Sequence, residues 1–167
     1  LFLFNVIFAQ DDYLNLPSDK GDEFKLEIKD FDFWLSINTR WIDMDSLGHI
    51  NSNSYLSYME TGRIDTFIQI GYEGINRDMD ESTILASMEV SYMKQLFHPL
   101  SLKVGHRIAR VGSKSYDLLS GIFIENNNSL ACAAYFKLVS FDYKRNQSIL
   151  VPKKIRKNCR PLKYQDE

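Results

Sequence analysis

Apolar and polar residues follow two different periods along this chain, and each period predicts its own kind of secondary structure. Across residues 31–42 aromatic and β-branched residues predominate and alternate loosely with others, which suits a β-strand. Across residues 52–70 the large apolar residues instead recur at steps of three and four, the pattern of an amphipathic α-helix. Gly62 lies inside this helix, where glycine costs about 1 kcal/mol relative to alanine. We therefore expect the helix to pack closely against a neighbouring element at Gly62.

The rest of the chain reads as consecutive strands. They are expected at residues 84–92, 100–111, 116–125, 130–143 and 148–151. Residues 126–129 have the composition of a hairpin turn, because asparagine tolerates a positive φ. One strand, one long helix and then four or five strands is an α+β order. It predicts a mostly antiparallel sheet that covers the helix.

Length and composition narrow the class of protein. The 167 residues suffice for one domain with a proper core, and 44% hydrophobic with 25% charged residues are globular values. Cys132 and Cys159 form neither a disulfide framework nor a zinc cluster. His98 and His106 have no acidic or cysteine partner at ligand spacing, so no metal site is expected. No phosphate loop or dinucleotide fingerprint is present, and we expect no cofactor.

Charge is distributed unevenly along the chain. Residues 1–90 hold 17 acidic and 6 basic residues, whereas residues 91–167 hold 5 and 14, for a net charge of −2. This balance argues against nucleic-acid binding. Either the basic half attracts an anionic ligand, or the two halves pair or solvate different faces. Residues 153–163 carry six basic residues and are expected to form a solvated tail.

The N-terminus stands apart from the rest of the sequence. Residues 1–10 are almost wholly apolar, but they are too short to span a bilayer, which takes about 20 apolar residues. They are read as the remnant of an export signal, an extra strand or an upstream extension, and no membrane association is expected. The polar stretch that follows is a linker. The predicted organisation is an extension over 1–30, one domain over 31–160 and a tail over 161–167.

Reactive side chains gather where the first strand ends and the helix begins, at residues 43–55. Ser52, Asn53 and Ser54 are expected to be capping or first-turn residues of the helix. Free backbone N–H groups and the positive end of the helix dipole then face Asp45 and His49. Such N–H groups stabilise charge on a carbonyl oxygen, while a carboxylate attacks the carbonyl or activates water. This arrangement suits acyl transfer. The alternative is that acids and asparagines simply cap a helix.

The same region resembles a known family signature. Residues 39–63 read TRWIDMDSLGHINSNSYLSYMETGR and resemble the signature of hotdog-fold acyl-CoA thioesterases of the 4-hydroxybenzoyl-CoA thioesterase type. That signature is an aromatic-ended strand, D-x-D-x-x-G-H, a hydrophobic residue and N, then N-x-x-Y-L and a helix with aromatic-x-E-x-x-R. Residues 86–92 and 110–116 resemble the family's second and third strands. The likeness covers roughly residues 32–160.

The resemblance implies a hotdog fold, in which a curved antiparallel sheet of five or six strands wraps around one long helix. It also implies a homodimer, or a dimer-of-dimers tetramer, with active sites at the subunit interface. The family's catalytic carboxylate maps onto Asp45, and its carbonyl-polarising backbone N–H maps onto Ser52. Asp43 falls at a supporting position. The family usually has Asn where this chain has Ser52. This change would keep a contact between substrate and the backbone N–H, but it would lose a contact made by the Asn side chain.

The implied substrate is an acyl-CoA ester, and such esters occur in the cytoplasm. Residues of the loop and helix are expected to shape the site or touch the substrate: His49, Asn51, Tyr55 and Glu60. Basic residues near strand ends are candidates for contacts with CoA phosphates: Lys94, Arg110 and Lys114. Aromatic residues suited to an acyl pocket are Phe67, Tyr92 and Phe97. An ion pair with Arg63, three residues on, is the alternative role for Glu60.

Three questions stay open at this level. Asp45 acts either as a nucleophile or as a general base. The acyl group is carried either by CoA or by acyl carrier protein, which a basic surface would also suit. A third reading is a hotdog module that binds acyl ligands without catalysis.

Overall fold

The computed structural model describes residues 26–73 and 80–162. Four segments lie outside the described residues: the apolar segment 1–10, for which an export signal was one interpretation, most of the predicted linker, loop 74–79 and residues 163–167. In chain order the elements are η1 (Ile28–Asp30), β1 (Phe33–Asn38), η2 (Trp41–Asp43), α1 (Ser52–Gln69), β2 (Ser82–Tyr92), β3 (Ser101–Val111), β4 (Ser115–Ile124), β5 (Ser129–Asp142), β6 (Gln147–Ser148) and α2 (Lys153–Lys157).

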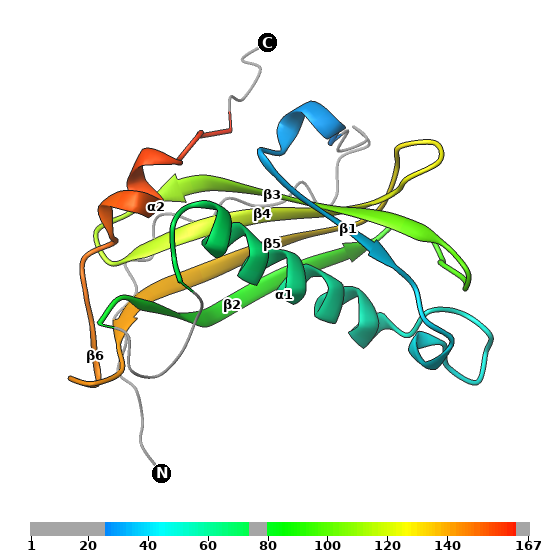
Figure 1. The fold of residues 1–167 in the computed structure, drawn as a ribbon, viewed down its shortest axis with the longest axis horizontal. Helices are drawn as coiled ribbons and strands as arrows, with labels where there is room; N and C mark the ends of the chain where they lie inside the picture. Colours follow the sequence, from blue (N-terminus) through cyan, green and yellow to red (C-terminus); the bar gives the residue numbers. More distant parts are fainter. Residues whose placement is uncertain (1–25, 74–79, 163–167) are drawn as a thin grey trace.

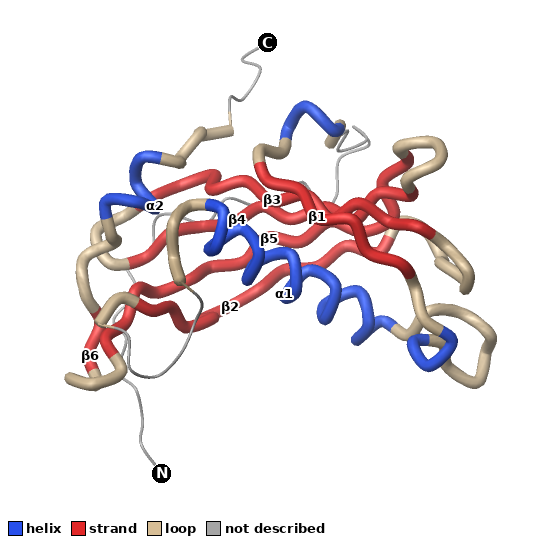
Figure 2. Tube along the Cα trace, viewed as in Figure 1, coloured by secondary structure: helices blue, strands red, loops and turns tan. Residues whose placement is uncertain are grey.

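The strands form one antiparallel sheet that curls around α1, as Figures 1 and 2 show. The strand order is β1-β3-β4-β5-β2, and the short strand β6 pairs with the end of β5. The strand that follows α1 in sequence, β2, therefore lies at the edge of the sheet far from β1. This architecture confirms the predicted α+β class and the hotdog fold.

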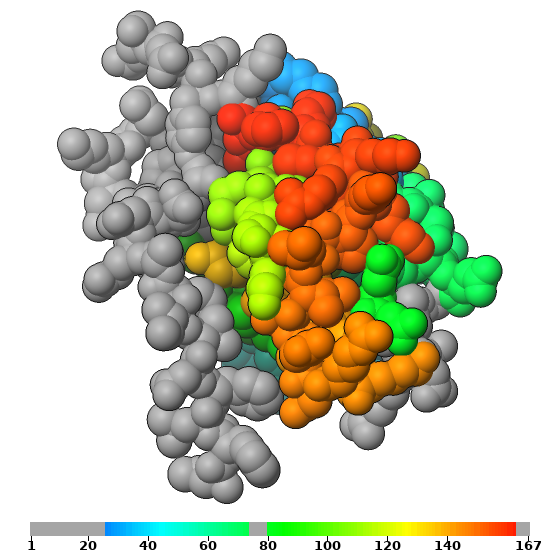
Figure 3. Space-filling model, turned by 90° about the vertical axis from the view of Figure 1, so that its left-hand side faces the viewer, coloured from blue at the N-terminus to red at the C-terminus, as the bar shows by residue number. Residues whose placement is uncertain are grey.

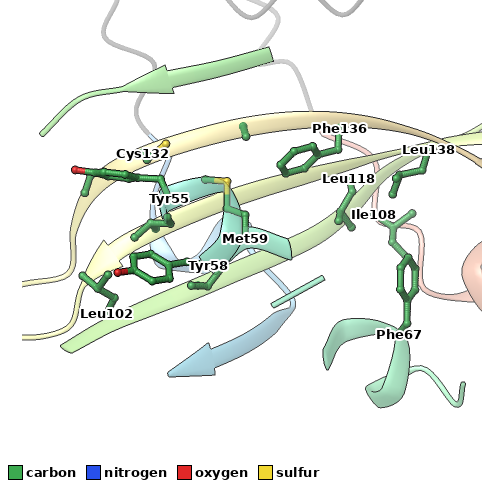
Figure 4. Packing of buried hydrophobic residues seen from close by; sticks show 14 of the residues in the cluster. Tyr55, Tyr58, Met59, Phe67, Leu102, Ile108, Leu118, Cys132, Phe136 and Leu138 are labelled. Carbon is green, nitrogen blue, oxygen red and sulfur yellow. The ribbon is translucent and has the colours of Figure 1, made fainter. Parts of the chain in front are cut away.

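The long helix lies on the concave face of the sheet and packs against β1, β3 and β4. Its buried face presents Tyr55, Tyr58, Met59 and Phe67 to the core, where they meet side chains of the strands (Figure 4). At Gly62 an added Cβ would lie 2.7 Å from His106 Nε2 on β3. The close approach predicted at this glycine is confirmed.

The observed limits of α1 and of β2 to β5 lie within two residues of the predicted ones, but the first strand is shorter. It ends at Asn38, and Trp41–Asp43 form a 3-10 turn instead of continuing to residue 42. The turn forms because the Asp43 carboxylate accepts the Arg40 backbone N–H at 2.8 Å. A carboxylate bond to a nearby N–H competes with strand pairing in this way.

The basic C-terminal segment does not form the expected solvated tail. Arg156 donates to the carbonyls of Gly112 and Ser113 in the β3–β4 turn, at 2.9 and 3.0 Å. Arg160 forms a 2.7 Å ion pair with Asp32. The segment from β6 to residue 162 thus covers one end of the molecule (Figure 3), held there by Arg156 on the turn carbonyls and by Arg160 on the Asp32 carboxylate.

Candidate active site

The loop before α1 is folded as a small hairpin that presents Asp45. Met44 bridges Ile50, and the Asp45 N–H donates to the His49 carbonyl at 2.8 Å. The Gly48 N–H closes the turn onto the Asp45 carbonyl at 3.1 Å. Gly48 has a φ of +79°, a conformation that glycine adopts without steric cost. The D-x-x-G spacing of the sequence is therefore a requirement of this turn.

The Asp45 side chain is half-buried and oriented by its own turn. One carboxylate oxygen accepts the Leu47 N–H at 2.9 Å. The other oxygen has no hydrogen-bond partner among the described residues. The carboxylate is therefore held in place while one oxygen stays available for substrate or water.

The start of α1 leaves one backbone donor available beside this carboxylate. Asn51 caps the helix: its side chain accepts the Asn53 N–H and its carbonyl accepts the Ser54 N–H, both at 2.9 Å. Within the described part of the chain, the Ser52 N–H has no acceptor. A free N–H at the positive end of an 18-residue helix is a good donor to a developing negative charge. The Asn51 side chain thus shapes the start of the helix, which is one of its two expected roles.

Asp43 holds the loop against the helix. Its carboxylate is buried, accepts the Tyr58 hydroxyl at 2.6 Å and pairs with Arg40 at 2.7 Å. The hydrogen bonds from Arg40, aided by the one from Tyr58, hold the Asp43 pKa below its ordinary value of 3.8. The Asp43 carbonyl also accepts the Asn51 N–H at 2.8 Å. These contacts match the supporting position that the sequence predicted.

An open pocket of about 340 Å³ lies where this loop, the helix start and the end of β2 meet. Its lining residues are Asp45, His49, Ile50, Ser52, Tyr55, Tyr92, Met93, Lys94 and Gln95. The candidate carboxylate and the candidate donor thus share one pocket. His49, Tyr55, Tyr92 and Lys94 join them as predicted. Ile50, Met93 and Gln95 also line the pocket and were not predicted, because their side chains carry no charge or aromatic ring that would single them out.

Two tyrosines form the aromatic part of the pocket wall. The Tyr55 hydroxyl donates to the Lys94 carbonyl and accepts the Leu96 N–H, each at 3.0 Å. Its ring is only 3% exposed. Tyr92 packs edge-on against Tyr55, with ring centroids 5.4 Å apart, and its hydroxyl donates to the Ser52 carbonyl at 3.3 Å. Tyr55 therefore fixes the segment after β2 beside the helix, and its hydroxyl is occupied by backbone.

The other predicted contacts lie away from this pocket. Glu60 is exposed on α1 and pairs with Arg63 at 3.2 Å, as the alternative reading held. Arg110 pairs with Asp117, and Lys114 donates to Ser148 Oγ at 3.3 Å.

Sheet register explains why Arg110 and Lys114 are remote within one chain. Tyr92 pairs with Cys132 on β5, whereas Ser115, next to Lys114, pairs with Val139. Val139 lies seven positions after Cys132 along β5, which is about 23 Å of strand. The structure does not bring these two basic residues to the candidate site, and Lys94 is the predicted cation that lines it.

The remaining aromatic and histidine candidates do not line this pocket. Phe67 is a core residue, and Phe97 packs its ring 5.1 Å from that of His49 without lining the pocket. His98 Nδ1 lies 3.0 Å from the Thr39 carbonyl. His106 is fully buried beneath α1, and this burial lowers its pKa to about 3. The described residues contain no cluster of three or more His, Cys, Asp or Glu placed to hold a metal.

No helix among the described residues is long and apolar enough to cross a membrane.

Comparison with known proteins identifies the family. A family model described as the thioesterase-like superfamily matches residues 39–159. The uncharacterized protein YsmA of Bacillus subtilis (strain 168) is 27% identical over 105 residues, which are 63% of this chain and 70% of YsmA.

Solved structures agree with this assignment. The PA2801 protein from Pseudomonas aeruginosa is 30% identical, with a TM-score of 0.68 over 75% of this chain and 95% of that one. A thioesterase from Thermus thermophilus, solved with coenzyme A and Zn, is 26% identical, with a TM-score of 0.66 over 77% and 97%. The family model spans most of the chain and includes the loop and helix that form the pocket. This protein therefore belongs to the thioesterase-like superfamily.

Proposed function

We propose that this protein hydrolyses acyl-CoA thioesters, with Asp45 as the catalytic carboxylate and the Ser52 N–H as the donor to the thioester carbonyl. The observation that carries the proposal is that both groups line one pocket, each with hydrogen-bonding capacity left over. Membership of the thioesterase-like superfamily supports the same class of reaction.

The chemistry follows from the two groups. The thioester carbonyl oxygen accepts the Ser52 N–H, and the helix dipole stabilises the negative charge that develops there as the carbonyl carbon is attacked. In one route Asp45 attacks, CoA leaves as the thiolate, and water hydrolyses the resulting anhydride. In the other route Asp45 takes a proton from the attacking water. Both routes end in a free acid and CoA, and both need Asp45 ionised.

Two observations favour CoA as the carrier of the acyl group. Lys94 lines the pocket and is exposed, so it is placed to meet phosphate groups. The Thermus thermophilus thioesterase of the same fold was solved with coenzyme A. We place the reaction in the cytoplasm, where acyl-CoA esters occur.

We further propose that the enzyme is a homodimer, or a tetramer built from such dimers. Among the described residues β2 pairs only with β5, so its other edge is open. Leu85 and Met88 on β2 are exposed apolar residues beside this edge. An open edge with apolar side chains is a surface that a second strand covers. Light scattering should give a multiple of the 19.5 kDa chain mass, and Met88→Asp should lower it. A monomeric wild-type protein would contradict this assembly.

The test of the reaction is thiol release from a panel of short, medium, long and aromatic acyl-CoA esters. Asp45→Asn should lower kcat by several orders of magnitude while the thermal midpoint changes little. The matched control is Asp65→Asn. Asp65 is also a half-buried aspartate, but its carboxylate accepts a hydrogen bond from the Gln69 side-chain amide, one turn further along α1.

Three outcomes would change the proposal. Wild-type turnover by Asp45→Asn would show that the catalytic carboxylate lies elsewhere. Hydrolysis of acyl carrier protein esters alone would replace CoA as the carrier. No hydrolysis of either ester would leave a module that binds acyl groups.

A further inference from the structure

Tyr92 stands where the candidate pocket meets the helix-side face of β2. It is the last residue of β2, and its hydroxyl reaches across to the Ser52 carbonyl at 3.3 Å. Its ring stacks edge-on against Tyr55, at an interplanar angle of 89°. Both rings line the candidate pocket.

The two rings differ in how firmly they are held. Tyr55 is 3% exposed, and its hydroxyl makes two hydrogen bonds to the segment after β2. Tyr92 is 48% exposed, and one long hydrogen bond anchors its hydroxyl. Tyr55 is thus a fixed part of the fold. Tyr92 is the part of this wall that substitution can remove without opening the core.

Beyond Tyr92, apolar residues continue along the same face of β2. Side chains alternate along a strand, so Val90 and Met88 share the face of Tyr92. Val90 packs against the main core, and Met88 is 49% exposed opposite Phe136. From Tyr92 to Met88 this row extends about 13 Å. In the proposed dimer a second copy would cover this row.

The polarity of the pocket decides which part of the substrate faces this wall. His49 and Lys94 supply polar and cationic groups suited to the phosphate-bearing part of CoA, whereas Tyr55, Tyr92 and Met93 supply apolar surface. A thioester with its carbonyl at the Ser52 N–H would therefore direct its acyl chain toward the tyrosines.

We propose that Tyr92 is the specificity-determining residue of this site: its ring ends the acyl-binding part of the pocket and so limits the length of the acyl chain. The inference rests on the proposed thioesterase function. It predicts that the favoured substrates carry short or compact acyl groups.

Tyr92→Val tests the idea, because valine suits a strand and removes the ring. Initial rates on saturated acyl-CoA esters of increasing length give kcat/KM for each. The wild-type value should fall beyond a limiting length, and the variant should move that limit by at least about two carbons. Each methylene newly buried should raise the variant's kcat/KM relative to wild type about fourfold, the equivalent of about 0.8 kcal/mol.

Two matched variants separate ring volume from other effects. Tyr92→Phe keeps the ring without the hydroxyl, so its length limit should equal that of wild type. Tyr143→Val removes an exposed tyrosine that follows β5 and should leave the length profile unchanged. Thermal midpoints for all variants check folding.

Each outcome separates this inference from the proposed function. A uniform drop at every chain length in Tyr92→Val, with the limit unmoved, would mean that the ring is only structural and would overturn the inference while leaving thioesterase activity intact. A shifted limit in Tyr92→Phe would also overturn it, because the ring would not be the barrier. Absence of hydrolysis by the wild-type protein on every ester would overturn the proposed function and the inference with it.

Discussion

Replacing Ser52 by proline would remove the proposed carbonyl donor and little else. Ser52 is the first residue of α1, a position where helices accept proline because its N–H has no role in the helix. The residue before proline must be extended, and Asn51 already has φ −61° and ψ 142°. The Asn51 cap and the rest of the helix can therefore stay as they are.

The expected magnitude follows from the role of the N–H. Removal of one oxyanion donor lowers kcat by about 10²–10³-fold, or about 2.7–4 kcal/mol of transition-state stabilisation. A proline that fits the native backbone instead raises folding stability by about 0.4–1 kcal/mol, since it restricts the unfolded chain. Ser52→Pro should therefore lose activity without losing stability. Ser52→Ala keeps the N–H and should retain kcat within a few-fold.

Thiol-release kinetics and urea unfolding of the three proteins provide the assay. Wild-type kcat in Ser52→Pro would refute the assignment of the donor. A large loss in Ser52→Ala would show that the hydroxyl acts, contrary to a backbone contact.

Three further predictions test the support of the site and its substrate contact. Tyr58→Phe removes the 2.6 Å hydrogen bond to the Asp43 carboxylate and should lower the free energy of unfolding by about 1.5–3 kcal/mol in urea titrations. The Asp43 pKa lies below 3.8, so this difference should be full above about pH 4 and fade as the pH falls through the lowered pKa. Gly62→Ala places a Cβ 2.7 Å from His106 Nε2. The resulting overpacking should lower the free energy of unfolding by about 1–3 kcal/mol, which a lower thermal midpoint would report. Lys94→Ala should raise KM for acyl-CoA at low salt and leave KM for acyl-N-acetylcysteamine unchanged, because the latter has no phosphates. Equal effects on the two KM values would refute a phosphate contact.

Local sequence patterns predict much of the fold. The helix from Ser52 follows from apolar spacing and from a polar cap, both of which act over a few residues. The turn at Gly48 follows from the short-range demand for a positive φ. Asp45 could be chosen as the candidate carboxylate because the family signature places it in this same turn. These features need no knowledge of distant contacts.

Long-range contacts decided the features that the sequence predicted wrongly. The turn that ends the first strand is closed by the Arg40 N–H bond to the Asp43 carboxylate, and the Tyr58 hydroxyl, 15 residues further on in α1, holds that same carboxylate in the core. The basic C-terminal segment is docked because Arg156 donates to the Gly112 and Ser113 carbonyls in the β3–β4 turn. Each depends on a partner distant in sequence, which periodicity cannot report.

The composition of the pocket is likewise a tertiary result. Lys94 and Arg110 both lie near the ends of strands, and the sequence gives no means of ranking them. The strand that follows α1 crosses to the far edge of the sheet, and its antiparallel pairing with β5 brings Tyr92 to the helix start. Sequence thus determined the helix and pointed to the candidate carboxylate and the candidate N–H donor. Strand order and register decided which side chains surround them, because in a sheet neighbours are set by pairing and not by distance along the chain.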